Sequence, residues 1–310
     1  MDPYILVYDV RTSSLKAVVY DEAGKVIIKR SQFYEFDSPR EGWAEIDPTV
    51  WWNSLVSVTK ELAGEEIDLS KLQGIALTGQ MHSAVLLGDD HEVIAPSILW
   101  LDRRASEETD ELQRKFDLKP YKLNSSYTLP KLYWLSKHRP EQLRKVRTIL
   151  WPKDYLRMRL TGEKVTDFTE GIGAAMIDWE TGKWLPERIE VCGLSTEVLP
   201  EIRPQEEVCE LRREVAEELG LSPNCRVLIG MGDIASLLGG APHEKGRLVY
   251  SMGSSSMYFT EIGEGLEEAK GLYTLELNGY RLFGGVSSTT GASLNWAYET
   301  IGGGEAVIKL

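Results

Sequence analysis

Two segments that lie far apart in the chain align without a gap: LVYDVRTSS at 6–14 and LVYSMGSSS at 248–256. Each runs from an apolar strand through small hydroxyl residues into an outgoing strand, LKAVVY after the first and MYFTEI after the second. Further strands expected at 272–277 and 280–286, and a helix from about 291, repeat the order that follows the first copy. Chance similarity of two short strand–turn–strand pieces is the alternative, but the shared order favours a duplicated unit. The repeat therefore predicts two related lobes with facing hairpins, an arrangement that suits a nucleotide clamped between them.

The overall charge and the cysteine pattern restrict the class of protein. A chain of 310 residues can form about two domains with ordinary cores. The formal net charge of −13 argues against nucleic acid or an anionic membrane as the main partner. Three widely spaced cysteines are typical of a reduced protein without a disulfide framework or a zinc site. With no basic N-terminal region and no apolar run of membrane-spanning length, the sequence predicts a cytoplasmic protein.

The order of strands and helices predicts an α/β fold. Three strands are expected in the first 34 residues, because apolar and polar residues alternate there around the turn DEAG. A helix should begin with Asp47 as its N-cap and Pro48 in its first turn, and end near Gly64. LQGIALTGQ at 72–80 is typical of a buried strand. The other expected elements are helices near 104–116, 128–146, 152–160 and 206–219, the last with an apolar face, and a strand at 226–230.

The first copy of the repeat has the features of a loop that approaches phosphate. Its strand ends near Asp9, and the following turn carries the small hydroxyl residues Thr12 and Ser13. Arg11 stands where such a turn would be expected to have glycine, and the second copy has Gly253 at that position. The segment is therefore a phosphate site, a damaged one, or only a hairpin. If it is a phosphate site, Arg11 either blocks the loop or clamps phosphate through its guanidinium group.

VLIGMGDIASLLGGA at 227–241 contains the strongest candidate for a catalytic residue. An apolar strand leads through Gly230 and Gly232 to Asp233, where a helix of small residues begins. Glycines let the backbone come close to a ligand, and a carboxylate at such a point can accept a proton from a substrate hydroxyl. Asp is also a favoured helix N-cap, so a purely structural role for Asp233 is the alternative.

Two further segments follow strands and carry polar residues. LTGQMHSAVLL places Gln80, Met81 and His82 just past a buried strand, where an amide, a thioether and an imidazole suit a polyol. The alternative for His82 is a histidine satisfied within the fold at a strand end. ILWLDRRA at 98–105 adds Asp102 and two arginines, for which a solvated helix face is the alternative.

The set of motifs resembles the FGGY carbohydrate kinases, and most closely the xylulose kinases among them. GQMH, ILWxD, PKDYLR at 152–157, the Asp233 strand and the SMGSSSMYF hairpin occur in the order and spacing of that family, and SYTLPKLYWLSKH at 126–138 satisfies its first signature. The resemblance implies an actin-like, ribonuclease-H-like α/β fold. We expect one complete sugar-binding lobe at 1–245 and the beginning of a second, ATP-binding lobe at 246–310.

The resemblance also implies a role for each candidate residue. Asp233 would be the general base of an ATP-dependent sugar kinase, and Asp9 would hold Mg²⁺, through water. The residues expected to bind the sugar are Gln80, Met81, His82 and Asp102. The residues expected to face the nucleotide phosphates are Asp9, Arg11, Thr12, Ser13, Gly253, Ser254 and Ser255. The implied cofactors are ATP and Mg²⁺, the implied small-molecule partners are a sugar and ATP, and a homodimer is expected as an option.

Three departures from the family pattern separate the functional alternatives. Arg11 replaces the glycine of the first phosphate loop, and Ile234 replaces the asparagine that follows the catalytic Asp in xylulose kinases. The sequence also stops at Leu310, before the family's glycine-rich adenine site and second signature. The leading hypothesis is a sugar kinase that works with a further C-terminal portion, which a separate chain could supply. The alternative is a non-catalytic sugar-binding remnant or pseudokinase, and the sugar-side motifs disfavour an actin-like or chaperone-like ATPase.

Overall fold

The computed structural model describes residues 4–64, 67–118, 122–241, 246–252, 256–261, 272–277, 280–287 and 289–301. The chain divides into two compact units, Met1–Asp233 and Ile234–Leu310, and each is described by itself. The boundary expected after residue 245 lies later in the chain than this division and stays a prediction of where one lobe ends.

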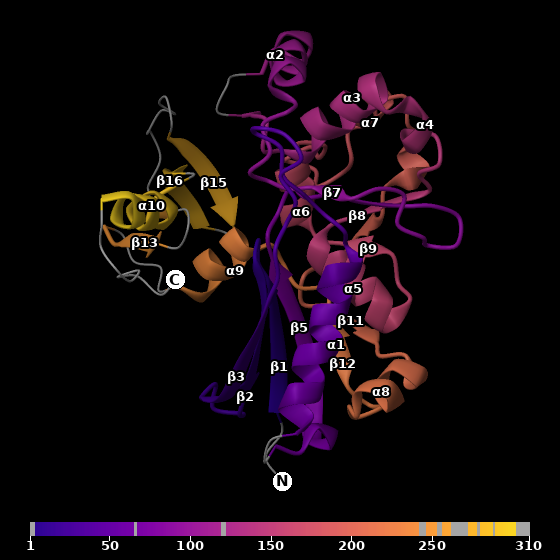
Figure 1. The fold of residues 1–310 in the computed structure, drawn as a ribbon, viewed down its shortest axis with the longest axis vertical. Helices are drawn as coiled ribbons and strands as arrows, with labels where there is room; N and C mark the ends of the chain where they lie inside the picture. The colour runs from indigo at the N-terminus through magenta and orange to yellow at the C-terminus, as the bar shows by residue number, and fades with distance from the viewer. Residues whose placement is uncertain are drawn as a thin grey trace. The chain divides into compact units, whose positions relative to one another are not determined.

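A six-stranded mixed sheet forms the centre of the first unit, in the order β11-β12-β5-β1-β2-β3 (Figure 1). Its strands are β1 (Tyr4–Val10), β2 (Ser14–Tyr20), β3 (Val26–Phe33), β5 (Leu72–Gly79), β11 (Val208–Glu210) and β12 (Arg226–Leu228). The first three form an antiparallel meander, whereas β1, β5 and β12 run parallel and β11 pairs antiparallel at the edge. The three strands predicted at the N-terminus are confirmed, because Leu6, Tyr8 and Val10 alternate into the core.

The main hydrophobic core lies between this sheet and three helices. They are α1 (Thr49–Ala63), α5 (Pro152–Thr161) and α8 (Arg213–Leu219). Trp51 and Leu55 of α1 are fully buried in this core, and burial of side chains of this size stabilises a fold by roughly 1.5–3 kcal/mol each. At the start of α1, Asp47 Oδ1 accepts a hydrogen bond from the Thr49 backbone N–H at 2.9 Å. The predicted helix start at Asp47 and Pro48 is therefore correct to within a residue.

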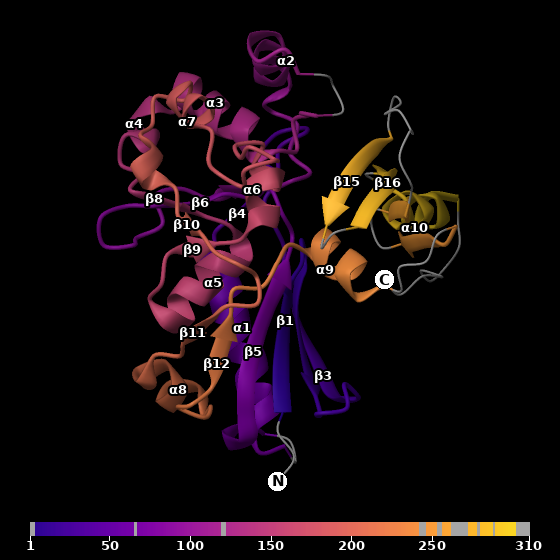
Figure 2. The same cartoon turned by 180° about the vertical axis from the view of Figure 1, so that it is seen from behind.

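A second hydrophobic core belongs to a mostly helical part of the same unit (Figure 2). Its helices are α2 (Ser106–Lys115), α3 (Thr128–His138), α4 (Pro140–Leu143), α6 (Phe168–Ala174) and α7 (Pro186–Glu190), and its short strands are β6 (Val85–Leu87), β7 (Ser97–Ile98) and β8 (Thr148–Leu150), with a 3₁₀ turn at Thr196–Val198. The first unit also contains β4 (Glu45–Ile46), β9 (Val165–Thr166), β10 (Glu201–Ile202) and a 3₁₀ turn at Leu69–Lys71. The helix predicted at 128–146 is two helices, because Pro140 lacks the N–H that would continue α3. In the described part of the chain, no helix is both long and apolar enough to span a bilayer.

The prediction of one helix over 206–219 is wrong in its first half. Residues Val208–Glu210 form strand β11 and pair with Arg226–Leu228. Val208, which helical periodicity placed on an apolar face, is 47% exposed. The apolar spacing of this segment fits both a strand and a helix over so few residues, and pairing with the sheet edge decides the outcome.

The second unit begins, like the first, with an antiparallel pair of consecutive strands, but its third strand in sequence lies at the edge of its sheet beside the fourth strand and not beside the second. Its sheet has the order β13-β14-β16-β15, all antiparallel, and a helix follows. The elements are β13 (Leu248–Met252), β14 (Ser256–Glu261), β15 (Tyr273–Leu277), β16 (Tyr280–Ser287) and α10 (Gly291–Ile301). The two hairpins differ in register, since Val10 faces Leu15 whereas Met252 faces Ser256. The expected phosphate residues Gly253, Ser254 and Ser255 lie outside the described residues.

Five ionisable side chains of α5, of α6 and of the residue before α6 are buried together. Lys153 Nζ lies 2.6 Å from Asp154 Oδ1 and 2.7 Å from Asp167 Oδ1, and Arg157 Nη1 lies 2.9 Å from Asp154 Oδ1. Burial by itself would raise the pKa of Asp154, but Lys153 and Arg157 outweigh it and lower that pKa. The two positive charges of Lys153 and Arg157 therefore balance the two negative charges of Asp154 and Asp167. Glu170 is the fifth member, fully buried, and neither of its carboxyl oxygens has a hydrogen-bond partner.

Burial raises the pKa of Glu170 well above its ordinary value, and the carboxylates of Asp154, Asp167 and Asp233 raise it further against the opposing effect of Lys153. Folding therefore favours the neutral form of the Glu170 carboxyl. A carboxyl whose pKa is raised by folding stabilises the fold fully below its unfolded pKa, and this contribution is lost as the pH rises towards the folded pKa.

Glu170→Gln tests this charge assignment, because Gln keeps the shape but does not ionise in the unfolded chain. The variant should gain free energy of unfolding relative to the wild type as the pH rises from 4 to 8, by at most about 1.4 kcal/mol per pH unit. Denaturant unfolding across this pH range measures the difference. A variant that becomes relatively less stable with rising pH would mean that Glu170 is ionised and paired in the native state.

Candidate functional site

The carboxyl ends of three parallel strands bring three of the expected site segments to one edge of the sheet, namely the turn after Asp9, the segment from Gln80 to His82 and the loop of Asp233. β1 pairs with β5 in the register Asp9 to Thr78 and Val10 to Gly79, and β12 lies on the other side of β5. The Gln80 N–H donates to the Val10 carbonyl at 2.8 Å, so the two chains stay paired one residue beyond the strand. In open α/β sheets, ligands bind at this edge.

The turn after β1 is held from three directions. The Tyr34 hydroxyl lies 2.6 Å from the Arg11 carbonyl oxygen, and Gln80 Nε2 donates to the same carbonyl at 3.2 Å. Trp100 Nε1 donates to Thr12 Oγ1 at 2.9 Å, which ties the turn to the ILWLD segment. Burial and the nearby Asp9 carboxylate raise the pKa of Tyr34, so its hydroxyl stays a donor. These bonds give the hairpin one defined shape.

Arg11 contacts the expected Mg²⁺ ligand. Its Nε lies 2.6 Å from Asp9 Oδ2, and the two side chains are 51% and 23% exposed. The guanidinium therefore covers one oxygen of the carboxylate rather than extending away from the turn. Ion pairs with this exposure contribute little, about 0–1 kcal/mol, so the contact opens at low cost.

Met81 and His82 lie where two glycines leave room for them. A Cβ on Gly232 would come within 2.6 Å of Met81 Sδ, and a Cβ on Gly173 within 2.8 Å of Met81 Cε. His82 Nδ1 lies 2.6 Å from the Gly173 carbonyl oxygen, and the His82 ring lies 4.8 Å from the ring of Tyr127. His82 has the left-handed backbone angle φ 71°, a strained state that its contacts maintain.

The protonation state of His82 follows from these contacts. Burial lowers its pKa to about 4, although the Gly173 carbonyl favours the charged form. The ring is therefore neutral at pH 7. Because a carbonyl can only accept, Nδ1 carries the proton and Nε2 is an acceptor. An acceptor nitrogen of this kind suits a sugar hydroxyl.

Asp102 is tied into the protein itself. Its Oδ2 accepts from the Ala44 N–H at 2.6 Å and from Arg104 Nη2 at 2.7 Å, and its Oδ1 accepts from the Arg104 N–H at 2.8 Å. The residue is buried, and Arg104 also stacks over the Trp43 ring at 3.7 Å. These contacts favour a structural role for Asp102, and its expected contact with the sugar stays a prediction.

Asp233 is exposed and begins helix α9 (Asp233–Gly240). Two glycines direct the loop before it. Gly230 has φ 73° and lies so close to the Leu77 carbonyl that a Cβ would overlap it. The Gly232 N–H donates to Thr169 Oγ1 at 3.0 Å. Close packing and one buried hydrogen bond thus bring Asp233 to the edge where β5 ends.

Helix α6 contacts two segments of the candidate site, and the sequence patterns gave no indication of this. Thr169 near its start bonds the loop of Asp233, and Gly173 near its end bonds His82. The available signal was Asp167 followed two residues later by Thr169, a pattern of a helix N-cap, and Asp167 indeed accepts from the Thr169 N–H at 2.7 Å. Such a cap predicts a helix start and gives no hint of a site.

No cluster of three or more His, Cys, Asp and Glu side chains suited to a metal occurs among the residues that the structure describes. The protein ligand that the sequence predicts for Mg²⁺ is Asp9. A single carboxylate suits this ion where phosphates and water supply the remaining ligands. The contact with Arg11 involves only Oδ2, so Asp9 keeps a second oxygen for an ion or its water.

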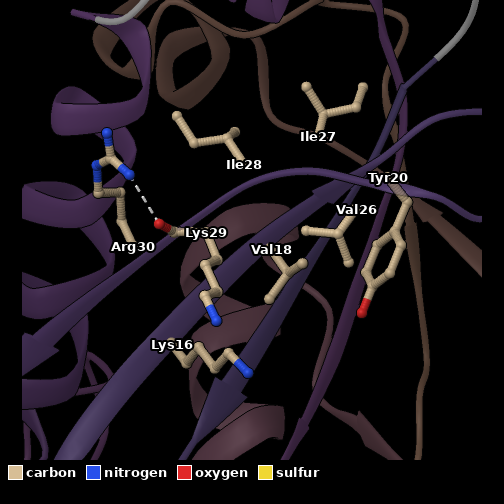
Figure 3. Close-up of a pocket in the computed structure, with 8 residues that line it drawn as sticks. All are labelled: Lys16, Val18, Tyr20, Val26, Ile27, Ile28, Lys29 and Arg30. Carbon is tan, nitrogen blue, oxygen red and sulfur yellow. Dashed lines mark hydrogen bonds between the residues drawn. The ribbon is translucent and has the colours of Figure 1, made fainter.

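An open cavity of about 570 Å³ lies on β2 and β3, and contains none of the expected site residues. Its lining residues are Lys16, Val18, Tyr20, Val26, Ile27, Ile28, Lys29 and Arg30 (Figure 3). Figure 3 shows the Lys16 and Lys29 ammonium groups near each other over the strands. The cavity is a feature of the outer strands and is distinct from the sheet edge described above.

Comparison with curated proteins gives close relatives that are longer than this chain. The xylulose kinase of Lactococcus lactis subsp. lactis (strain IL1403) is 34% identical over 97% of this chain and 62% of its own length. The xylulose kinase of Escherichia coli (strain K12) is 31% identical over 83% of this chain and 54% of its own length. The chain thus spans less than two thirds of the curated relatives it matches.

Solved structures agree with these relatives. A ligand-bound xylulose kinase from Lactobacillus acidophilus matches with a TM-score of 0.86 and 26% identity, over 97% of this chain and 63% of that chain. A gluconate kinase from the same organism matches with a TM-score of 0.87 and 25% identity, over 99% of this chain and 64% of that chain. Both likenesses confirm the expected actin-like α/β fold. Residues 4–239 match the model of the N-terminal domain of the FGGY family of carbohydrate kinases, and the chain belongs to this family.

Proposed function

We propose that this chain is the sugar-binding and base-carrying part of an ATP-dependent kinase that phosphorylates xylulose or a related ketose or polyol. The observation that carries the proposal is the meeting of three segments at one sheet edge: the hairpin turn after Asp9, the segment from Gln80 to His82, and the loop of Asp233. A hydroxyl acceptor, a carboxylate and a phosphate-sized turn at one place suit phosphoryl transfer to an alcohol.

The proposed reaction uses the residues of this chain for binding and proton transfer. His82 Nε2 accepts a hydrogen bond from a sugar hydroxyl, and Gln80 and Met81 complete a wall against the sugar. The Asp233 carboxylate takes the proton of the attacking sugar hydroxyl. The oxygen of that hydroxyl bonds to the γ-phosphorus of ATP, while the bond from this phosphorus to ADP breaks and ADP leaves. The N–H groups and hydroxyls of Thr12 and Ser13 face the phosphates. Mg²⁺, held through Asp9, neutralises phosphate charge when bound.

Activity is proposed for a form that contains more than these 310 residues. Relatives extend well beyond the matched length, and a C-terminal portion supplied in the same chain or by a separate chain would complete the second lobe. The proposed setting is the cytoplasm, with sugar and ATP as small-molecule partners and neither nucleic acid nor a membrane. A homodimer is compatible with this proposal.

A second candidate function is a non-catalytic sugar-binding protein or pseudokinase. The contact of Arg11 with Asp9 favours it, because a guanidinium on the expected Mg²⁺ ligand competes with the ion. The two candidates differ in one respect, since both bind sugar and only the kinase transfers phosphate.

Asp233→Asn tests the catalytic role. The amide keeps the shape of the carboxyl but accepts no proton, so phosphate transfer in the active form should fall ~10²–10⁴-fold while sugar affinity persists. A coupled ADP-release assay and sugar calorimetry measure the two quantities. Asp68→Asn is the matched control, since Asp68 also begins a short helix, accepting from the Ser70 N–H at 3.1 Å. Equal, small effects of both changes would reduce Asp233 to a helix cap.

His82→Ala tests the sugar site in this chain alone. The wild type should bind xylulose weakly, at ~1 mM, because closure of a second lobe is lost, and the variant should not bind. Wild-type affinity should stay constant from pH 8 to pH 5.5, because the His82 pKa is about 4 and Nε2 remains an acceptor. His138→Ala, at a half-exposed histidine, is the control. Affinity that declines around pH 6.5 would contradict the buried neutral ring.

Arg11→Gly tests whether the guanidinium blocks the turn. Removal of the contact exposes the Asp9 carboxylate, so Mg-triphosphate should bind up to about fivefold more tightly, the equivalent of an exposed ion pair of ~1 kcal/mol. Calorimetric titration measures the affinity. Arg226→Ala, which breaks an exposed pair with Glu210 at 3.1 Å, should leave it unchanged. A variant that binds tenfold more weakly would instead identify Arg11 as a phosphate clamp.

A further inference from the structure

Helix α6 contacts both functional segments that follow the parallel strands. Thr169 Oγ1 accepts from the Gly232 N–H at 3.0 Å, directly before Asp233. The Gly173 carbonyl accepts from His82 Nδ1 at 2.6 Å. One short helix therefore determines the spacing between the expected base and the expected sugar ligand.

The start of α6 is in turn fixed by the buried charges. Asp167 Oδ2 accepts from the Thr169 hydroxyl, which leaves the hydroxyl oxygen directed to Gly232. Asp167 Oδ1 lies 2.7 Å from Lys153 Nζ, which itself contacts Asp154. The path from Gly232 thus runs through a hydroxyl and a carboxylate to a buried ammonium group.

The same path returns to the other end of the loop. Asp154 Oδ1 accepts from Arg157 Nη1 at 2.9 Å, and the same Nη1 donates to the Ile229 carbonyl at 2.8 Å. The backbone from Ile229 to Gly232 is therefore held at both ends by one continuous chain of side chains. All the charged members of that chain are at most 1% exposed.

Stability alone is a poor reason for such a chain of charges. Burial of ion pairs costs several kcal/mol of desolvation for each ion, and apolar residues of similar volume often serve stability as well. Buried charges that contact one another in this way favour a single geometry, because at low dielectric each ion pair and hydrogen bond is weakened strongly when its partner moves. The segment that these contacts hold in place is the loop before Asp233.

We propose that α6, anchored through Asp167 and Lys153, is a positioning element that sets Asp233 relative to His82. This inference rests on the proposed roles of those two residues. Thr169 acts through the Gly232 backbone and touches no reacting atom, so it is a positioning residue. The Thr169 hydroxyl fixes the position of Asp233 through the Gly232 backbone, and the Gly173 carbonyl fixes the position of the His82 ring.

Thr169→Val and Thr169→Ser separate positioning from packing. Valine has the shape of threonine without the hydroxyl, so amide exchange of the peptide containing Gly232 should be at least tenfold faster, while serine should restore the wild-type rate. In the active form, Val should lower kcat ~10²-fold with the sugar KM changed less than threefold, since the Gly173 contact with His82 remains. Thr109→Val is the matched control. Thr109 is 5% exposed against 4% for Thr169, and its hydroxyl donates to the Ala105 carbonyl at 2.7 Å.

Each result decides the inference. Unchanged exchange at Gly232 in Thr169→Val, or a sugar KM that rises as much as kcat falls, would overturn it, as would equal effects of Thr109→Val. If the wild type transfers no phosphate in any form, the proposed function fails. In that case, amide exchange at Gly232 and the sugar affinity of this chain still test the inference. Faster exchange in Thr169→Val with unchanged sugar affinity would support it, and unchanged exchange would overturn it.

Discussion

The parallel pairing of β1 with β5 and of β5 with β12 is the constraint on which the site depends. Gly79 lies against Val10, where a Cβ would come within 2.6 Å of the carbonyl oxygen. Gly230 lies against the Leu77 carbonyl in the same manner on the other side of β5. Any side chain at either glycine would force the backbones apart. Because both approaches are this close, the polar residues that follow the three strands arrive at one edge.

Much of the fold can be predicted from local sequence patterns, and the predictions of strands and helices are wrong where those patterns are short. The alternation of apolar residues in 4–34 and the Asp47–Pro48 start of α1 are strong signals that tertiary contacts did not override. The segment 206–219 carries an apolar spacing that a strand and a helix both satisfy. Only the neighbouring strand at Arg226–Leu228 selects the strand for its first part. A single sequence contains no record of that pairing.

The candidate site could be anticipated to the extent that its residues come soon after strands. Gln80 and His82 lie one and three residues beyond β5, and Asp233 lies five residues beyond β12, so parallel topology brings the three segments to the same edge. The contribution of α6 was not predictable, because Thr169 meets its partner 63 residues along the chain and Gly173 meets its partner 91 residues away. Contacts of that separation depend on the completed fold, and a threonine or a glycine in a helix carries no local mark of them.

The two sides of the site are held by interactions of different strength. The Arg11 contact with Asp9 is half exposed, and such pairs stabilise by about 0–1 kcal/mol. The Lys153 contact with Asp167 is buried, and loss of Lys153 should cost roughly 3–5 kcal/mol, because the buried Asp167 carboxylate would be left without this cation. The turn after Asp9 can therefore rearrange at lower cost than α6 and the loop before Asp233. In the proposed kinase, this difference would keep the base and the sugar hydroxyl at a fixed distance while the nucleotide enters and leaves.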